Sequence, residues 1–328
     1  MYVITGGAGF IGSNIAAALD ERRPGSVVVC DRLRDGVKWK NLAKRELIDI
    51  IPPEDMFAYL DHHPGDIEAV IHMGAISSTV ETDADKIVAN NFRLSLGLWK
   101  WCALHKVRLI YASSAATYGD GAKGFDDNAA PGALAALRPL NPYGWSKHLF
   151  DRRVARLLAA GETPPPQWAG LKFFNVYGPN EYHKAGQQSV AVQVHARAAA
   201  GEPARLFKSH RPDCKDGGQV RDFIWVGDCV DIVLWLLDNP RVNGLFNCGT
   251  GQARSFADLA GAVFAALGRK PQIDYVPMPE SLRDKYQYFT EARMDRLRAA
   301  GYAQPFTALE DGVGRYVRDY LAAADPHR

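Results

Sequence analysis

The sequence contains few cysteines, and they are not arranged as metal ligands or redox pairs. Five cysteines occur among 328 residues, and no two have the C-x-x-C spacing of a zinc site or a thiol redox centre. The nine histidines likewise show no metal-ligand spacing. We therefore predict no bound metal. Isolated, reduced thiols are typical of a reducing compartment, and we predict a cytoplasmic protein.

Long apolar runs and a strong net charge are also missing. The longest apolar stretches, such as residues 232–237, fall far short of the roughly 18 residues needed to cross a bilayer. Met1 is followed at once by an expected strand, so we expect no secretion signal. The net charge of +2 provides no basic stripe for nucleic acid. We predict neither a membrane nor a nucleic-acid partner.

Short β-branched runs alternate with helical patterns in the first half of the chain. Strands are expected at residues 2–5, 26–30, 69–72, 108–112 and 171–174, and helices at residues 13–21, 83–104 and 146–160. This alternation is typical of βαβ units, whose strands run parallel. The sequence thus predicts an α/β fold with a Rossmann-type, doubly wound parallel sheet.

The alternation weakens after Gly178-Pro179, where expected helices at 189–200 and 256–267 are mixed with loops. Residues 221–246 regain strand and helix character. We predict a dinucleotide-binding Rossmann domain at residues 1–174, rejoined by about 221–246. A smaller C-terminal α/β lobe at 175–220 and 247–328 is expected to bind the substrate.

A glycine-rich turn follows the first expected strand directly. Gly6 allows a sharp turn, Gly9 allows the backbone to approach a pyrophosphate, and Gly12 allows close packing of helix and strand. Free N–H groups at the start of the following helix attract phosphate. Asp31 ends the second strand, nineteen residues after Gly12, where an acid that contacts the ribose is expected. These features predict dinucleotide binding.

The residues after the second strand bear on which dinucleotide is bound. Asp31 favours the free 2′-hydroxyl of NAD, whereas Arg32, Arg34 and Lys38 could hold the 2′-phosphate of NADP. The alternative for these cations is a solvated loop. We predict NADP, with NAD left open.

A serine, a tyrosine and a lysine form a candidate catalytic set. Tyr143 and Lys147 are four residues apart on an expected helix that Pro142 begins, so both side chains lie on one face. A nearby ammonium and a positively charged nicotinamide would favour the phenolate of Tyr143, which could then accept a proton from an alcohol. Ser114 follows an expected strand, at the edge where open α/β sheets place their sites.

Together, these motifs resemble the extended short-chain dehydrogenase/reductase family, which includes nucleotide-sugar epimerases and dehydratases. The resemblance covers essentially the whole chain, including the turn after His72 and the loop at 175–179. It implies a nicotinamide cofactor. Besides the glycines Gly6, Gly9 and Gly12, the residues it assigns to that cofactor are Phe10, Ile11, Asp31, Arg32, Lys38, Met73, Gly74, Ala75, Ile76, Ser77, Asn90, Lys147 and Val176.

Two alanines decide among the reactions of this family. Ala115 and Ala116 stand where its dehydratases carry an acidic pair, so we reject a dehydratase.

The loop at 180–186 is similar to that of the family branch that epimerises C6 of an ADP-linked heptose for lipopolysaccharide. That resemblance implies oxidation to a 6-ketone and return of the hydride to either face. Tyr143 would be the base for one epimer and Lys184 for the other.

Three alternatives remain open at the level of sequence. Lys184 could contact a phosphate instead of acting as a base. The chain could be a UDP-hexose 4-epimerase that uses Tyr143 alone. It could also be a non-catalytic, NADP-sensing binding protein, although such proteins commonly lose the tyrosine or lysine that is present here.

The resemblance further implies a nucleotide-sugar substrate and a homo-oligomer, a pentamer. The substrate contacts it implies are Ser114, Asn175, Gly186, Gln193, Phe207, Lys208, Ser209, Arg221 and Tyr286. The sequence departs from the family pattern at two places. Pro52-Pro53 stands where a basic residue for the NADP phosphate is expected, and the stretch at 209–218 is longer than usual.

Overall fold

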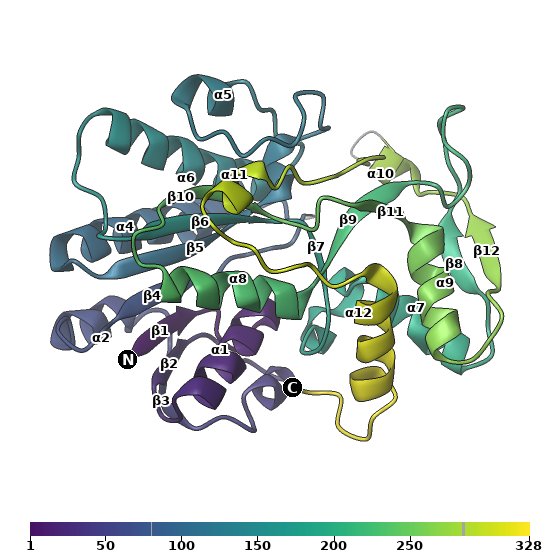
Figure 1. Cartoon of the computed structure of the whole chain (residues 1–328), viewed down its shortest axis with the longest axis horizontal. Coiled ribbons are helices and arrows are strands. Elements are labelled where there is room, and N and C mark those ends of the chain that lie inside the picture. Colours follow the sequence, from purple (N-terminus) through teal and green to yellow (C-terminus); the bar gives the residue numbers. More distant parts are fainter. Residues whose placement is uncertain (80, 284–285) are drawn as a thin grey trace.

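A parallel sheet of seven strands organises the computed structural model, which describes residues 1–79, 81–283 and 286–328 (Figure 1). Its strand order is β10-β6-β5-β4-β1-β2-β3, and every pair in it is parallel. The strands are β1 (Tyr2–Thr5), β2 (Val27–Cys30), β3 (Leu47–Ile51), β4 (Ala69–His72), β5 (Arg108–Ser114), β6 (Trp168–Phe173) and β10 (Gly244–Cys248). The order reverses direction between β1 and β4, which is the arrangement of a Rossmann-type fold. The predicted fold class is confirmed.

Helices and short helical turns account for most of the remaining chain. The helices are α1 (Phe10–Arg22), α2 (Met56–His62), α3 (Ala84–Ile87), α4 (Leu94–His105), α5 (Pro131–Ala135), α6 (Pro142–Ala159), α7 (Val190–Ala199), α8 (Val226–Asp238), α9 (Phe256–Ala266), α10 (Glu280–Arg283), α11 (Asp295–Ala299) and α12 (Leu309–Arg315). The 3₁₀ or π-helical turns are η1 (Lys38–Asn41), η2 (Val88–Arg93), η3 (Ala115–Tyr118), η4 (Tyr182–Gln187) and η5 (Tyr316–Leu321).

Helices cover both faces of the sheet. Successive residues of a strand point to opposite faces, so Ile4 packs in the cluster that contains α1 and α8. Its neighbour Val3 packs with α4 and α6. Because both faces are covered, the inner strands are apolar along their length rather than alternating. The stretch Val27–Cys30 is buried at every position.

A second group of elements lies beside the main sheet. Strands β7 (Asn175–Tyr177), β9 (Val220–Trp225) and β11 (Ala253–Ser255) form one small sheet, and β8 (Ala204–Phe207) pairs with β12 (Ile273–Val276) in another. Helices α7, α9 and α12 pack around them. From β9 the chain passes through α8 to β10, which pairs with β6 in the main sheet. We propose that these small sheets and their helices form the substrate lobe.

Two local features differ from the sequence-based expectations. Strand β3 was not expected, because its Ile48, Asp49 and Ile50 are all exposed at the sheet edge and so show no alternating pattern. The helix expected at 83–104 is divided into α3, the π-helical turn η2 and α4. A π turn inserts one residue and changes which side chains face inward. Among the described residues, no helix is both long and apolar enough to span a bilayer.

The burial of the main sheet leads to a stability prediction. Ile4→Ala should lower the free energy of unfolding by about 2–5 kcal/mol, because Ile4 is fully buried and its loss leaves a cavity. Ile48→Ala is the matched control: Ile48 is 47% exposed on β3, and its loss should cost about 1 kcal/mol or less. Urea unfolding of both variants measures the difference, and equal losses would contradict this placement of β1 and β3.

Candidate active site

The glycine turn that joins β1 to α1 is packed too closely for larger residues. Gly6 has a φ of +66°, and a Cβ there would lie 2.6 Å from the backbone nitrogen of Gly74. A Cβ on Gly12 would lie 2.2 Å from the carbonyl oxygen of Gly6. The turn leads into α1, whose N-cap residue Gly9 provides no side-chain hydrogen bond to the first N–H groups of the helix; a helix start of this kind can bind a pyrophosphate.

Asp31 links this turn to the segment that follows β2. Its carboxylate accepts a hydrogen bond of 3.0 Å from the Ala8 N–H and pairs with the Lys38 amine at 2.5 Å. Lys38 also donates to the Arg32 carbonyl, whereas the Arg32 guanidinium pairs with Glu54 at 2.9 Å. Of these two predicted cofactor cations, Lys38 pairs with Asp31, the acid predicted to contact the ribose, whereas Arg32 pairs with Glu54.

A chain of buried hydrogen bonds runs from β1 to the helix that carries Tyr143. The Thr5 hydroxyl lies 2.6 Å from His72 Nδ1, and His72 Nε2 lies 2.8 Å from the Ser95 hydroxyl. Ser95 donates to the Asn91 carbonyl, and the Asn91 amide donates to the Ser146 hydroxyl. Burial, with the nearby charge of Lys147, lowers the pKa of His72 to about 3, so the imidazole in this chain is neutral.

Asn91 holds the turn that follows β4. Its Oδ1 accepts from the Ile76 N–H at 2.8 Å, and its Nδ2 donates to the Ile76 carbonyl at 3.0 Å. The sequence assigns a cofactor-side role to Asn90, but the Asn90 amide donates to the Lys86 carbonyl on the partly exposed side. The neighbouring Asn91 is fully buried, because the π turn η2 places the two asparagines on different sides.

Ser114, Tyr143 and Lys147 come from the end of β5 and the start of α6. Asn141 caps α6 by accepting from the Gly144 N–H at 2.8 Å, and Pro142 occupies its first turn. The Lys147 amine is buried and donates to the Ala112 carbonyl on β5 at 2.7 Å. This bond ties α6 to the strand that ends at Ser114.

Burial controls the protonation of the two titratable groups in this set. It raises the pKa of Tyr143 above its usual value, and a hydrogen bond with Ser114 acts in the opposite direction. It lowers the pKa of Lys147 to about 8, although the charge of Asp151 acts against this. The sequence predicts a lowered pKa for Tyr143. In the chain by itself burial prevails, so a phenolate requires added positive charge at the site.

A fully buried ion pair supports the catalytic set from behind. Lys172 on β6 pairs with Asp151 on α6 at 2.9 Å, and neither side chain is exposed. Lys172 also donates to Thr117, whose hydroxyl donates to the Ser114 carbonyl. Asp151 lies four residues after Lys147, so the same helix face carries both. That spacing is a signal from which the sequence could have identified Asp151.

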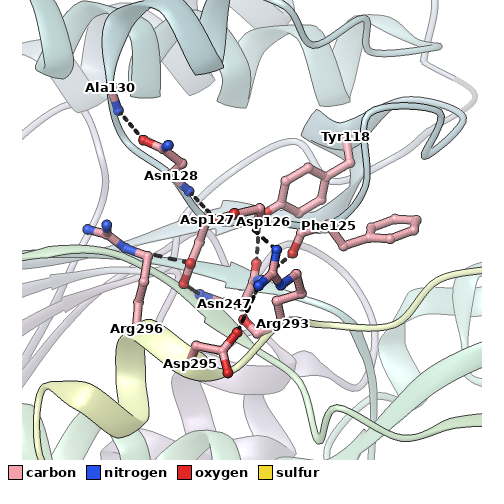
Figure 2. Close-up of polar contacts among 10 residues, drawn as sticks. All are labelled: Tyr118, Phe125, Asp126, Asp127, Asn128, Ala130, Asn247, Arg293, Asp295 and Arg296. Carbon is pink, nitrogen blue, oxygen red and sulfur yellow. Dashed lines mark hydrogen bonds and ion pairs between the residues drawn. The ribbon is translucent and has the colours of Figure 1, made fainter.

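A second polar cluster that was not predicted from the sequence connects the segment after β5 to β10 (Figure 2). The Tyr118 hydroxyl donates to Asn247 Oδ1, and the Asn247 N–H donates to the Asp127 carboxylate, both at 2.7 Å. The Asn247 amide donates to the Phe125 carbonyl at 2.8 Å. Burial raises the pKa of Asp127 to about 6, and Arg296 lies 3.6 Å from it. These bonds hold the segment after Ser114 in one conformation.

Lys184 lies in η4, on the phosphate-loop side of the site. Its amine stands 5.2 Å from the centre of the Phe10 ring, at the first residue of α1. Burial lowers the pKa of Lys184, and the negative charge of Glu181 opposes this. A lysine whose neutral form is favoured by burial can act as a base.

Aromatic and cationic side chains meet in the proposed substrate lobe. The Arg221 guanidinium lies 5.0 Å from the centre of the Tyr286 ring, and Phe207 packs edge-on against the same ring. The structure therefore brings three predicted substrate residues together. Gln193 donates to Gln188, Ser209 bonds within its own loop, and Asn175 and Gly186 are exposed.

Comparison with known proteins places this geometry in a family. Residues 2–249 match the model of the NAD dependent epimerase/dehydratase family. The chain belongs to this family. It is 52% identical to a protein of Nitratidesulfovibrio vulgaris named ADP-L-glycero-D-manno-heptose-6-epimerase, over 99% of both chains.

Solved structures of this epimerase/dehydratase family superpose on nearly the whole chain. An ADP-L-glycero-D-manno-heptose-6-epimerase of Helicobacter pylori matches with a TM-score of 0.77 and 27% identity, over 98% of this chain and 96% of that one. A UDP-glucose 4-epimerase of Thermus thermophilus in complex with NAD matches with a TM-score of 0.73 and 26% identity, over 95% of this chain and 96% of that one.

Within the described part of the chain, no group of three or more His, Cys, Asp or Glu side chains could hold a metal ion.

The buried ion pair behind the site predicts a large effect of a single substitution. Lys172→Met should lower the free energy of unfolding by about 3–5 kcal/mol, because it leaves the Asp151 carboxylate buried without its partner. Lys172→Met combined with Asp151→Leu should recover part of that loss. Urea unfolding measures both, with Lys100→Met on the exposed side of α4 as the control. A loss no larger than that of the control would contradict the proposed support.

Proposed function

We propose that this protein epimerises C6 of ADP-D-glycero-β-D-manno-heptose to give ADP-L-glycero-β-D-manno-heptose. The observation that carries the proposal is the 52% identity, over 99% of both chains, to the Nitratidesulfovibrio vulgaris protein of that name. The site supports it, because Ser114, Tyr143 and Lys147 suit an alcohol oxidation. Ala115 and Ala116 provide no acid or base for elimination.

The cradle around Gly6 and Gly12 and the acid Asp31 fit a nicotinamide dinucleotide. When bound there, that cofactor would supply the hydride acceptor for oxidation at C6 and the hydride donor for the reverse step. Tyr143 accepts the hydroxyl proton of one epimer, with Ser114 bonded to the same oxygen. The positive charge of a bound, oxidised nicotinamide would add to that of the buried Lys147 ammonium, and together they would favour the Tyr143 phenolate.

The second epimer requires a base on the other side of the ketone, and we assign Lys184 to this role. The 6-hydroxyl groups of the two epimers point in different directions, so a single fixed base serves only one of them. The burial of Lys184 and its lowered pKa support a base rather than a permanently charged phosphate contact.

The cofactor is assigned as NADP. Lys38 is the cation nearest the ribose-binding acid, and its amine pairs with Asp31 at 2.5 Å. When NADP binds, its 2′-phosphate would replace the Asp31 carboxylate as the charge-assisted hydrogen-bond partner of the Lys38 amine. A second basic residue that could hold the phosphate beside Lys38 is missing, because prolines stand at positions 52 and 53.

The nucleotide-sugar is assigned to the substrate lobe. Arg221 provides a cation for a phosphate, and Tyr286 and Phe207 provide aromatic surfaces for the base. The other proposed substrate contacts are Asn175, Gly186, Gln193, Lys208 and Ser209.

We also propose that the protein is cytoplasmic and that it forms a homo-oligomer, a pentamer. Exposed apolar side chains at Trp39, Ile48 and Ile50 support self-association.

The direct test incubates the purified protein with ADP-D-glycero-β-D-manno-heptose without added reductant and follows the sugar by proton NMR. The proposal predicts appearance of the C6 epimer and no conversion of UDP-glucose or UDP-N-acetylglucosamine. Conversion of a UDP-hexose with no change in the heptose would assign the protein to 4-epimerisation instead. No turnover of any sugar with cofactor bound would favour a sensor.

The two-base scheme predicts the effect of two substitutions. Tyr143→Phe and Lys184→Met should each lower kcat for epimerisation by about 100-fold or more, since each removes a proton acceptor. Cofactor content and the unfolding midpoint should stay unchanged. Lys270→Met, an exposed lysine in the substrate lobe, is the control. If Lys184→Met raised only KM, Lys184 would be a phosphate contact.

The cofactor assignment predicts a selective loss in a third variant. Lys38→Ala should weaken NADP binding by about 10-fold or more, because it removes a charged partner of the phosphate and leaves the Asp31 carboxylate unpaired. NAD binding should change little. Titration of both dinucleotides by calorimetry measures this, with the exposed Lys40→Ala as control. Equal losses for the two would rule out a 2′-phosphate contact.

A further inference from the structure

The last four residues of the sequence, 325–328, lie against the loop that carries Lys184. The Tyr182 hydroxyl donates to the Pro326 carbonyl at 2.8 Å, and the Tyr182 and His327 rings meet edge-on with centres 5.3 Å apart. The Arg328 N–H donates to Asn180 Oδ1 at 3.0 Å. Residues 180–182 are therefore bonded to this segment through both backbone and side chains.

The same segment is fixed to the dinucleotide-binding elements. The Lys44 amine pairs with Asp325 at 2.9 Å and donates to the His327 carbonyl at 2.5 Å. The Arg328 guanidinium pairs with Glu21 on α1 at 3.1 Å. Residues 325–328 thus span from the neighbourhood of η1 and α1 to the loop at 180–182.

The other side of that loop is attached to the phosphate-binding turn. The Asn41 amide donates to two carbonyls, those of Ala8 in the turn at 2.9 Å and of Asn180 at 3.0 Å. The Asn180 amide donates to Ser13 on α1 at 3.0 Å. Asn180 has a φ of +73°, a conformation that non-glycine residues keep only when the surroundings hold it.

Lys184 is joined directly to this anchored loop. Its backbone N–H donates to the Glu181 carbonyl at 3.0 Å. The Glu181 carboxylate is buried and accepts from Ser189 and Tyr316. Displacement of residues 180–182 would therefore move Lys184 away from Phe10.

We propose that residues 325–328 are positioning residues for epimerisation, because they hold the loop at 180–182 against α1 and so keep the Lys184 amine beside the phosphate-binding turn. This inference rests on the proposed function, in which Lys184 is the second base. The segment touches neither of the proposed bases, so its effect passes through the loop.

The groups around the Lys184 amine determine how its pKa would change if the loop loosened. Burial against Phe10 of α1 lowers the pKa of Lys184, and the negative charge of Glu181 in the same loop opposes this. His183 lies next along the chain, near Lys38 of η1, and burial lowers the pKa of His183 to about 4, so it carries no charge at neutral pH. A loosened loop would hydrate the Lys184 amine and return its pKa toward the ordinary value.

The test releases the segment without touching the site. Lys44→Met combined with Arg328→Ala removes its two charged anchors, and Arg22→Ala is the control, since it removes the surface pair of α1 with Asp238. The double variant should lower kcat by about 10-fold, with KM and cofactor content unchanged. The limb of the kcat–pH profile that depends on Lys184 should move to higher pH. Adding Lys184→Met should cause no further loss than Lys184→Met alone.

Hydrogen–deuterium exchange keeps this test separate from the proposed function. Amides at 180–184 should exchange faster in the double variant than in the Arg22→Ala control. Unchanged exchange, or unchanged kcat despite faster exchange, would overturn the positioning role. Losses that multiply with that of Lys184→Met would also overturn it. If the unmodified protein fails to epimerise the heptose, the proposed function is wrong, and the exchange result still decides whether the segment holds the loop.

Discussion

The buried hydrogen-bond chain from Thr5 through His72, Ser95 and Asn91 to Ser146 is the interaction on which the rest of the site depends. It connects the strand before the glycine-rich turn to the helix that carries Tyr143 and Lys147. Its imidazole is neutral because burial disfavours the charged form. In a low-dielectric interior, each bond of such a chain is costly to lose, so the parts it joins keep their spacing.

Epimerisation places a second requirement on the fold. A dehydrogenase needs one proton acceptor, whereas inversion at C6 needs one acceptor for each epimer. In the proposed scheme Tyr143 is held by the main sheet through α6. Lys184 belongs to a loop attached to α1 on one side and to residues 325–328 on the other. The glycine-rich turn joins β1 of the main sheet to α1, so the proposed cofactor cradle and the placement of both proposed bases depend on the same backbone.

Much of this arrangement could be predicted from local sequence. Inner strands such as β2 are apolar at every position, and the glycines at 6 and 12 are required by close backbone contacts. What could not be predicted depends on tertiary contacts. Strand β3 is exposed at the sheet edge, and the burial of Asn91 beside a partly exposed Asn90 follows from a π turn. Burial outweighs the Ser114 hydrogen bond in its effect on the pKa of Tyr143, and no short-range pattern reports burial.

The measurement that tests the account most directly is epimerisation of ADP-D-glycero-β-D-manno-heptose in D₂O, with the product examined at C6 by NMR and mass spectrometry. Transient oxidation predicts an epimer that keeps its original C6 hydrogen, because a hydride taken from the sugar returns to the same carbon without meeting solvent. Deuterium at C6 of the product would contradict the account, since it would mean that the hydrogen left as a proton.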